Sequence, residues 1–525
     1  MPILLLLYPC LTIAACVIVL DYIRILHLRR NLPPGPFPWP IVGNMLSLSS
    51  SKPWLQFEKW SQANGEGMLT IWIGRFPNII CNDAWSASDL MEKRSQLYSS
   101  RPRYIIFGDI TKQQECNQVF MPYNDHWRLQ RKVMHTGVGS QAIKPYKEIQ
   151  EAEGKILMQE LLSSPTDFAK YYERYACSLV AILAYGRRIV SKDDYMLRFA
   201  VTMMDNITLM QVPGLFWLEA LPVLQYMPSW LYALPQRLRR RSAATAKYWW
   251  SLVEEGSKAA EPNFAKELIR SKEEMGLTNL DIAEMIANLI GGGLDTTSST
   301  MHTLTLGLCT HPEVVQKAHE ELDRVVGKER SPTWSDIENL PYCQAVLKEA
   351  FRWRSVTAMG GFAHTPIRND VYRDYTLPAG IHVYGNLWGI HRHPKDFPDP
   401  DCFNPDRYLV ENRLPYPNQK GHNAFGWGRR SCSGQMFAEQ GLSMIVPRLL
   451  WAFDIKPGLD DNGNPVQLDI FAYTDSENTQ PLPFKASFIP RTEMIKQIII
   501  KEAVESREKL QGYEFEQKTR IEQFL

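Results

Sequence analysis

The sequence has no Cys-x-x-Cys pair, and its nine cysteines are scattered along 525 residues. Disulfide frameworks and zinc sites need cysteines at close or regular spacing, so we expect neither of them. Mostly reduced thiols favour a body that faces the cytosol. The odd number leaves room for one cysteine with a special role.

The sequence also has almost no excess of either charge, because 58 basic and 57 acidic residues leave a formal net charge of +1. No block of like charge dominates, so we expect no nucleic acid partner. Glycine fingerprints for flavin or nicotinamide binding are missing too, as are internal repeats and low-complexity tracts. Any such electron carrier would therefore belong to a separate protein.

A long hydrophobic run is present at the N-terminus, where Ile3 to Leu20 is 18 residues without a charge. As a helix it would extend about 27 Å at ~1.5 Å per residue, close to the thickness of a thin bilayer. Arginines at 24, 29 and 30 follow, and such residues stay on the cytoplasmic side. We predict a membrane anchor over residues 1–22. A cleaved signal peptide is the alternative, but the basic start of such peptides is missing.

The rest of the chain divides by composition. Five prolines between residues 31 and 40 exclude helix and central strand, so residues 23–40 are predicted to form a basic, proline-rich hinge. Residues 41–490 form the predicted globular body. Residues 491–525 have apolar positions at helical spacing among many charges, which predicts an amphipathic C-terminal extension without an assigned role.

Within the body, residues 69–73 and 77–81 predict a β-hairpin, and further short strands are expected near 371–384. Helical periodicity covers most of the remainder. The long stretches are 142–163, 166–186, 242–272 and 278–326. The predicted fold class is therefore mainly α with small β-sheets (α+β).

One segment allows two interpretations. Residues 216–235 are rich in Trp, Leu, Tyr and Pro, and four arginines follow within 237–241. Apolar surface beside a basic cluster can dip into a membrane. A packed loop between two helices explains the same composition.

The most informative stretch is Phe425-Gly426-Trp427-Gly428-Arg429-Arg430-Ser431-Cys432-Ser433-Gly434. Glycines 426 and 428 allow a tight loop with positive φ. The loop delivers Cys432 to the start of a helix predicted over 434–453, where backbone N–H groups favour a thiolate. Pro447 should kink that helix.

This stretch resembles the Phe-x-x-Gly-x-Arg-x-Cys-x-Gly pattern of cytochrome P-450 enzymes, with Ser433 where many members carry proline. The resemblance implies the cytochrome P-450 fold and a haem b whose iron is held by the Cys432 thiolate, a ligand that favours O–O cleavage. Phe425 and Gly434 would contact the haem. Arg430 would meet a haem propionate, because a guanidinium suits a carboxylate.

Three further motifs follow the order of this family. Trp127 and Arg131 match its Trp-x-x-x-Arg helix and, as i and i+4 neighbours, would share one haem propionate. His364 would contact the other. Glu349 and Arg352 match its Glu-x-x-Arg pair, which Arg407 joins in a buried network that braces the haem-binding core.

Three consecutive glycines, 291–293, lie inside a helical pattern, and each costs about 1 kcal/mol against alanine. The resemblance gives a reason, because the central helix of the family passes over the haem and opens locally where oxygen binds. Gly292 is thus expected at the haem. Asp295 and Thr296 match the family's acid–alcohol pair and would relay protons.

The resemblance covers residues from about 30 to 490 and is closest to fungal microsomal members. It implies a monooxygenase that uses O2 on a small apolar substrate, with electrons from NADPH through a flavoprotein reductase. Arg128, Arg131 and Arg430 would lie near the reductase. The expected location is the endoplasmic reticulum membrane, with a single span and a cytoplasmic catalytic domain in contact with lipid.

The substrate is expected to be an aromatic or polyketide, terpenoid or alkaloid intermediate of secondary metabolism. Two other functions remain open. An O2-independent haem-thiolate isomerase or dehydratase would tend to lose the Asp295–Thr296 pair. A haem carrier or sensor would need neither a proton relay nor a substrate pocket.

Overall fold

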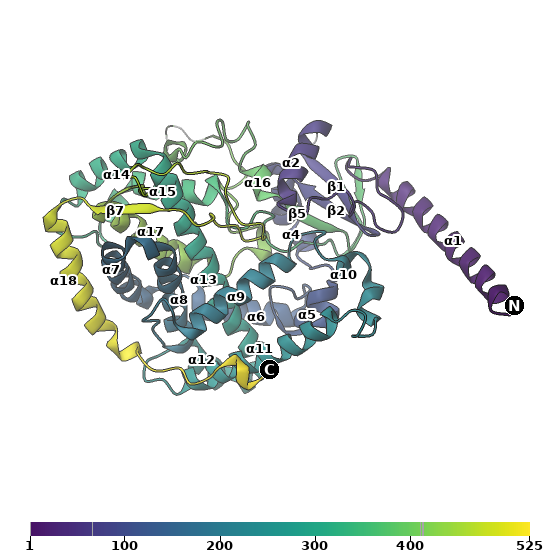
Figure 1. Ribbon diagram of the computed structural model, residues 1–525, viewed down its shortest axis with the longest axis horizontal. Coiled ribbons are helices and arrows are strands. Elements are labelled where there is room, and N and C mark those ends of the chain that lie inside the picture. The colour runs from purple at the N-terminus through teal and green to yellow at the C-terminus, as the bar shows by residue number, and fades with distance from the viewer. Residues whose placement is uncertain (1, 66, 410, 412–413) are drawn as a thin grey trace.

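The computed structural model describes residues 2–65, 67–409, 411 and 414–525. Helices make up most of this part of the chain and surround one long central helix (Figure 1). A three-stranded sheet lies at the side from which the N-terminal helix projects, and a strand pair lies at the opposite side. The predicted fold class, mainly α with small β-sheets, is confirmed.

The N-terminal helix α1 (Pro2–Arg29) is followed by helices that are mostly amphipathic and bury one face. In chain order these are α2 (Pro53–Asn64), α3 (Ala84–Ser88), α4 (Ser95–Tyr98), α5 (Gln113–Cys116), α6 (Asp125–Val138), α7 (Lys147–Ser163), α8 (Phe168–Tyr185), α9 (Tyr195–Met210), α10 (Trp217–Ala220), α11 (Leu234–Ser257), α12 (Phe264–Met275), α13 (Asn279–Thr310), α14 (Pro312–Val325), α15 (Pro341–Trp353), α16 (Leu387–Ile390), α17 (Gln435–Ala452) and α18 (Glu493–Leu510).

The strands form small sheets. Their bounds are β1 (Met68–Ile73), β2 (Phe76–Cys81), β3 (Asp370–Tyr372), β4 (Tyr375–Leu377), β5 (His382–Gly385), β6 (Phe453–Pro457) and β7 (Ala486–Pro490). β1 and β2 form the predicted hairpin, with Leu69 opposite Ile80, and β5 adds to β2 in parallel. β3 pairs with β4 and β6 with β7, both antiparallel.

Two of the predicted long helices are in fact pairs of helices. The stretch 242–272 is interrupted between α11 and α12, where the Asn263 side chain accepts a hydrogen bond from the Lys266 N–H and caps α12. The stretch 278–326 is interrupted at His311, because Pro312 restricts the residue before it and starts α14. Periodicity alone continues across both breaks, so the sequence-based bounds were wrong there.

The central helix α13 organises the core. It packs against α8, α9 and α11 and is buried along most of its length. A capping box starts it: the Thr278 hydroxyl accepts from the Asp281 N–H, and the Asp281 carboxylate accepts from the Thr278 N–H. This long buried helix and α17, with Pro447 inside it, carry the two opposite walls of the site.

The N-terminal helix α1 extends away from the body (Figure 1). Its segment Leu11–Arg29 is long and apolar enough to cross a membrane and is almost entirely unburied. The helix continues to Arg29, past residue 22, where the sequence predicted the end of the anchor. The hinge is therefore helical in its first part and extended only from about residue 32.

The C-terminal extension packs on the body. Ile495, Ile499 and Ala503 are buried on the inner face of α18, which contacts α7. Beyond α18 the chain crosses to α11, where the Gln517 amide donates to the Tyr248 hydroxyl at 3.0 Å.

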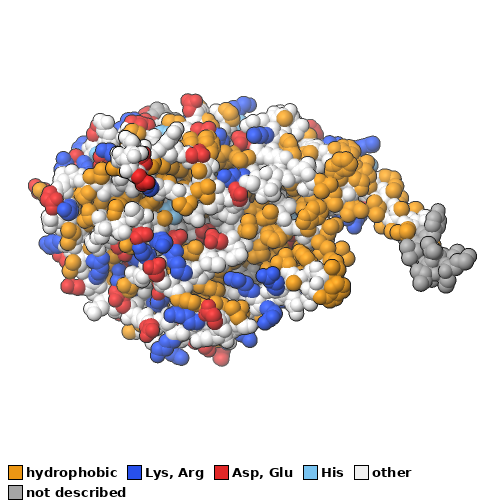
Figure 2. Space-filling model, viewed as in Figure 1, with side chains coloured by type: hydrophobic (Ala, Val, Ile, Leu, Met, Phe, Trp, Pro, Cys, Tyr) orange, Lys and Arg blue, Asp and Glu red, His pale blue; other side chains and the backbone are white. Residues whose placement is uncertain are grey.

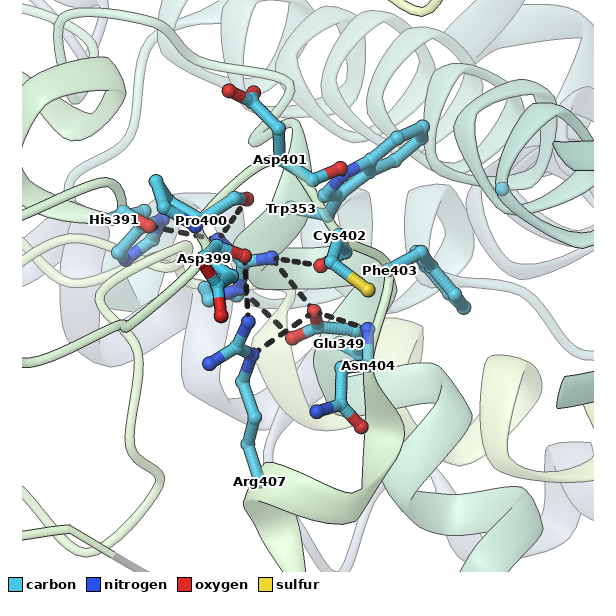
Figure 3. Close-up of polar contacts among 12 residues, drawn as sticks. Glu349, Trp353, His391, Asp399, Pro400, Asp401, Cys402, Phe403, Asn404 and Arg407 are labelled. Carbon is cyan, nitrogen blue, oxygen red and sulfur yellow. Dashed lines mark hydrogen bonds and ion pairs between the residues drawn. The ribbon is translucent and has the colours of Figure 1, made fainter. Parts of the chain in front are cut away.

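A buried ion-pair network braces the segment before the cysteine loop. Arg352 donates to both carboxylate oxygens of Glu349 at 2.6 and 2.8 Å, and both residues are fully buried. Arg407 lies 3.5 Å from the Glu349 carboxylate and also donates to a backbone carbonyl at Asp399 (Figure 3). Arg352 further donates to three backbone carbonyls of the 391–402 segment. The predicted three-residue network is present.

Glu349→Ala should lower the free energy of unfolding by roughly 3–5 kcal/mol, because two arginines would lose their buried counter-charge. Denaturant titration of the haem-loaded protein measures this. Glu505→Ala, in an exposed pair with Lys501, is the control and should change stability by less than about 0.5 kcal/mol. Equal losses in the two variants would contradict a bracing role for Glu349.

Candidate functional site

A cavity of about 340 Å³ lies inside the body between α13 and the loop that precedes α17. Its walls are mostly apolar. The sequence-predicted site residues that line it are Trp127, Arg131, Gly292, Thr296, Phe425, Arg430, Cys432 and Gly434. Asp295 and His364 lie outside this lining. The structure thus brings together residues that the sequence separates by about 300 positions.

The cysteine loop has the predicted backbone. Gly426 and Gly428 both have positive φ, at 75° and 52°, and a Cβ at Gly428 would lie 2.5 Å from the Met91 carbonyl oxygen. The Cys432 N–H donates to the Phe425 carbonyl at 2.9 Å, which closes the loop. Gly434 is the N-cap residue of α17. The space beside its Cα is empty, because a Cβ there would meet nothing within 4 Å.

The Cys432 side chain faces the cavity and is accessible from it. Burial in the protein raises the pKa of the thiol, whereas the N–H groups of Gly434 and Gln435 and the charge of Arg131 lower it. Two backbone donors at a helix start are a suitable environment for a sulfur that carries negative charge.

Three guanidinium groups, from Arg101, Arg131 and Arg430, meet at one end of the cavity. In the described chain none of them forms an ion pair, and their hydrogen-bond partners are backbone carbonyls and one hydroxyl. Burial and the other two arginines lower the pKa of Arg430 to about 8. Three buried like charges without a counter-charge fit a ligand that brings carboxylates, as the haem propionates do.

Of the predicted haem contacts, Trp127 packs on this arginine cluster and His364 lies near it. The Trp127 ring lies under the Arg430 guanidinium at 4.3 Å, and its indole N–H donates to the Gln118 carbonyl at 3.0 Å. His364 is buried and bonds the Tyr98 carbonyl at 3.0 Å through Nδ1. Burial and the charges of Arg101 and Arg430 keep the pKa of His364 well below its usual value. His364 is therefore neutral and lies near the cluster.

The opposite wall is α13. Gly292 and Thr296 line the cavity, and a Cβ at Gly292 would meet nothing within 4 Å. The Asp295 carboxylate instead accepts from the Asn478 side-chain amide, away from the cavity. Burial and the charges of Asp205 and Glu173 raise the pKa of Asp295 to about 7. Asp295 and Thr296 are thus adjacent in sequence, but only Thr296 lines the cavity, whereas Asp295 is bound by Asn478.

The expected local opening of this helix is not seen, since α13 is continuous through residues 291–297. The Thr296 hydroxyl donates to the Gly292 carbonyl at 2.6 Å, so the carbonyl that an opened turn would expose keeps a partner.

The sequence model of the cytochrome P-450 family matches residues 33–477. The chain is a member of this family. A cytochrome P-450 monooxygenase of Armillaria gallica is 33% identical to it over 95% of this chain and 97% of the relative. A cytochrome P-450 monooxygenase of Postia placenta is 32% identical, over 91% and 92%. A third, from Aspergillus niger, is 30% identical, over 93% and 96%.

A cytochrome P-450 monooxygenase is a haem-thiolate enzyme that needs O2, a redox partner and a substrate. The cavity fits that cofactor on its own evidence. It offers one accessible thiol on a glycine-rich wall, a cluster of uncompensated arginines, and a facing glycine that leaves room. The sequence-based assignment to the family, and to an oxidoreductase that uses haem iron, is confirmed.

Sequence reasoning missed two residues of this cytochrome P-450. Arg101 belongs to the arginine cluster, but it stands alone in a loop, and no motif singled it out. Asn478 binds the Asp295 carboxylate from a loop 183 residues away, so only the folded chain brings the two together.

Replacing Arg101 or Arg430 by leucine should speed haem loss by about tenfold or more, because a charge-assisted contact to a propionate would be lost. Transfer of haem to excess apomyoglobin measures the rate. Arg429→Leu is the control, since Arg429 is exposed, lies outside the cavity lining and contacts Tyr123. Unchanged loss rates in the Arg101 and Arg430 variants would show that the cluster does not hold the cofactor.

Proposed function

We propose that this protein is a membrane-anchored monooxygenase with haem b, in which Cys432 supplies the axial thiolate. One observation carries the proposal: the accessible Cys432 thiol faces Thr296 across a cavity that three uncompensated arginines border. When bound there, the haem would activate O2, placing one oxygen atom in the substrate and releasing the other as water.

The remaining steps belong to this chain's own residues. Arg101, Arg131 and Arg430 orient the cofactor by its carboxylates. Asp295, with a pKa of about 7, can both accept and donate a proton at neutral pH. The neighbouring Thr296 hydroxyl, which lines the cavity, would pass that proton on after it releases the Gly292 carbonyl. The apolar walls exclude water from the reacting carbon.

The electrons would come from NADPH through a separate flavoprotein reductase. Of the three arginines first expected at its docking face, Arg131 and Arg430 point into the cavity and Arg128 is exposed. Arg128 and Arg429 both stack on the Tyr123 ring, so they form a small basic surface outside the haem-binding end. An acidic patch on the reductase would complement it.

The cavity walls favour a small apolar substrate, such as an intermediate of fungal secondary metabolism. Val119, Leu289, Val356 and Phe362 are among the apolar residues that line the cavity. Aromatic rings from Tyr104, Phe107 and Phe120 pack around Phe362 behind this wall. A planar or polycyclic skeleton suits such a surface.

The activity is tested with the full chain, a fungal flavoprotein reductase and a panel of apolar compounds. Hydroxylated product should form only with both NADPH and O2 present, and one labelled atom from ¹⁸O2 should enter it. Product formation without O2 would instead support an isomerase or dehydratase. Haem binding without turnover of any compound that shifts the haem spin state would support a carrier or sensor.

Thr296→Ala should keep the haem and the substrate-induced spin-state shift but direct reducing equivalents into peroxide, because the proton donor at the cavity is lost. The ratio of peroxide to NADPH consumed measures this and should rise several-fold. Thr300→Ala, one turn further along α13, is the matched control and should leave the ratio unchanged. An unchanged ratio in Thr296→Ala would remove Thr296 from the proton relay.

The proposed location is the endoplasmic reticulum membrane, with α1 as a single span and the body in the cytoplasm. Apolar side chains continue from α1 onto the adjacent body (Figure 2). Exposed apolar residues there include Phe37, Trp39, Ile41, Leu46, Trp217, Val223, Tyr226, Trp230 and Leu231. The residues around Met45 pack against Ala220 and Leu221, so the two groups lie on one face. This favours the membrane-dipping interpretation of residues 216–235.

A variant without residues 1–30 should still sediment with phospholipid vesicles, because this apolar face remains. Adding Val223→Glu and Trp230→Glu to the deletion should release it, as measured by flotation. Ile489→Glu is the control, since Ile489 is also an exposed apolar residue but lies on β7. Full solubility of the simple deletion would contradict a second membrane contact.

A further inference from the structure

A pair of asparagine side chains interrupts the apolar wall of the cavity. Asn288 of α13 lines the cavity, and Asn117, from the loop after α5, lies behind it. The Asn288 amide donates to the Asn117 Oδ1 at 3.0 Å, and the Asn117 amide donates back to the Asn288 Oδ1 at 3.2 Å. The two amides thus bond each other twice.

Two further contacts fix the orientation of this pair. The Asn117 amide donates to the Glu284 carboxylate at 2.7 Å, and its Oδ1 accepts from the Val119 N–H at 3.0 Å. Glu284 is buried, and burial raises its pKa to about 7. Both N–H groups and both lone pairs of the Asn117 amide are therefore used, so Asn117 holds Asn288 and has nothing left for a ligand.

Asn288 keeps spare hydrogen-bonding capacity. A primary amide has two N–H donors and two lone pairs, and Asn117 takes one of each. No other partner of the Asn288 side chain occurs in the described part of the chain. One N–H and one lone pair are thus left on a half-buried residue at the cavity wall, where a polar group without a partner is unfavourable.

The position of Asn288 relates this amide to the reacting end of the cavity. Asn288, Gly292 and Thr296 are spaced four residues apart, so they lie on one face of α13. Eight residues of helix separate Asn288 from Thr296 by about 12 Å at ~1.5 Å per residue. A substrate that extends from Thr296 to Asn288 would therefore be about two or three fused or linked rings long.

We infer that Asn288 is a specificity-determining residue that binds a carbonyl or hydroxyl oxygen of the substrate, at the end remote from the carbon that is oxidised. This rests on the proposed function and narrows its substrate class. The substrate is an elongated apolar skeleton with one neutral oxygen group, which accepts from the free N–H of Asn288 or, as a hydroxyl, donates to its lone pair. An ammonium group is disfavoured, because the Glu284 carboxylate lies behind Asn117 and outside the cavity lining.

The test uses four probes of one skeleton: phenylcyclohexane, 4-phenylcyclohexanone, 4-phenylcyclohexanol and 4-phenylcyclohexylamine. Each is titrated into the full-length, haem-loaded protein, and the spin-state shift gives its Kd. The ketone and the alcohol should bind about five- to tenfold tighter than the hydrocarbon, the range of one net hydrogen bond. Under turnover, oxygen should enter the phenyl ring end of the ketone.

Asn288→Leu and Asn288→Ala should reduce the preference for ketone over hydrocarbon to less than about twofold, one hydrogen bond having been removed. Val119→Ala shortens a side chain of the same wall and leaves the Asn288 amide in place. It should raise the Kd of all four probes by the same factor. Thermal unfolding is followed in parallel, because a purely structural asparagine pair would lower the melting temperature without changing the preference.

Equal binding of ketone and hydrocarbon by the unmodified protein would overturn the inference. So would tightest binding of the amine, if its spin-state shift has the same direction as that of the ketone and thus excludes coordination of the amine nitrogen to the iron. So would an Asn288→Leu variant that keeps the full preference. Each result requires haem-loaded protein that responds to ligands. Failure to load haem would count against the proposed function itself, so the two failures are distinguishable.

Discussion

The arrangement of the whole site depends on one constraint, the placement of a single sulfur at the start of α17. Gly426 and Gly428 turn the preceding loop back on itself, and the Cys432 N–H closes it on the Phe425 carbonyl. Backbone N–H groups of Gly434 and Gln435 then favour negative charge on the sulfur. The Glu349 network fixes the segment before the loop, so a strongly coupled set of buried charges supports a short irregular stretch of chain.

The other walls of the cavity have separate roles in the proposed binding of haem. Arg101, Arg131 and Arg430 come from three separate segments and supply positive charge at one edge of the cavity. No acidic side chain in the described chain neutralises them. α13 supplies the opposite wall, with open space beside Gly292 and with Thr296, the residue proposed to deliver a proton. The few polar groups of this apolar cavity therefore carry both its chemistry and its selectivity. Asn288 fits this arrangement as the polar group at the far end from Thr296.

The sequence predicted the fold class, the β1–β2 hairpin and most of the residues that meet in the cavity, because each rested on a local pattern or on a short motif that resembles the cytochrome P-450 family. Positive φ at Gly426 and Gly428, the Trp127–Arg131 spacing and the Glu349–Arg352 pair are all read from a few neighbouring residues. The breaks at Asn263 and His311 were missed, since hydrophobic periodicity continues through them. Arg101, Asn478 and Asn117 were missed because their partners are distant in the chain. The continuous path of α13 past Gly292 could not be derived from glycine content, which only permits an opening.

Iron K-edge X-ray absorption on the purified, haem-loaded protein tests the central claim most directly, because it identifies the atoms bound to the iron. The account predicts a sulfur neighbour in the unmodified protein and its replacement by nitrogen in Cys432→His. A sulfur neighbour that persists in Cys432→His, or an unmodified protein without one, would contradict it.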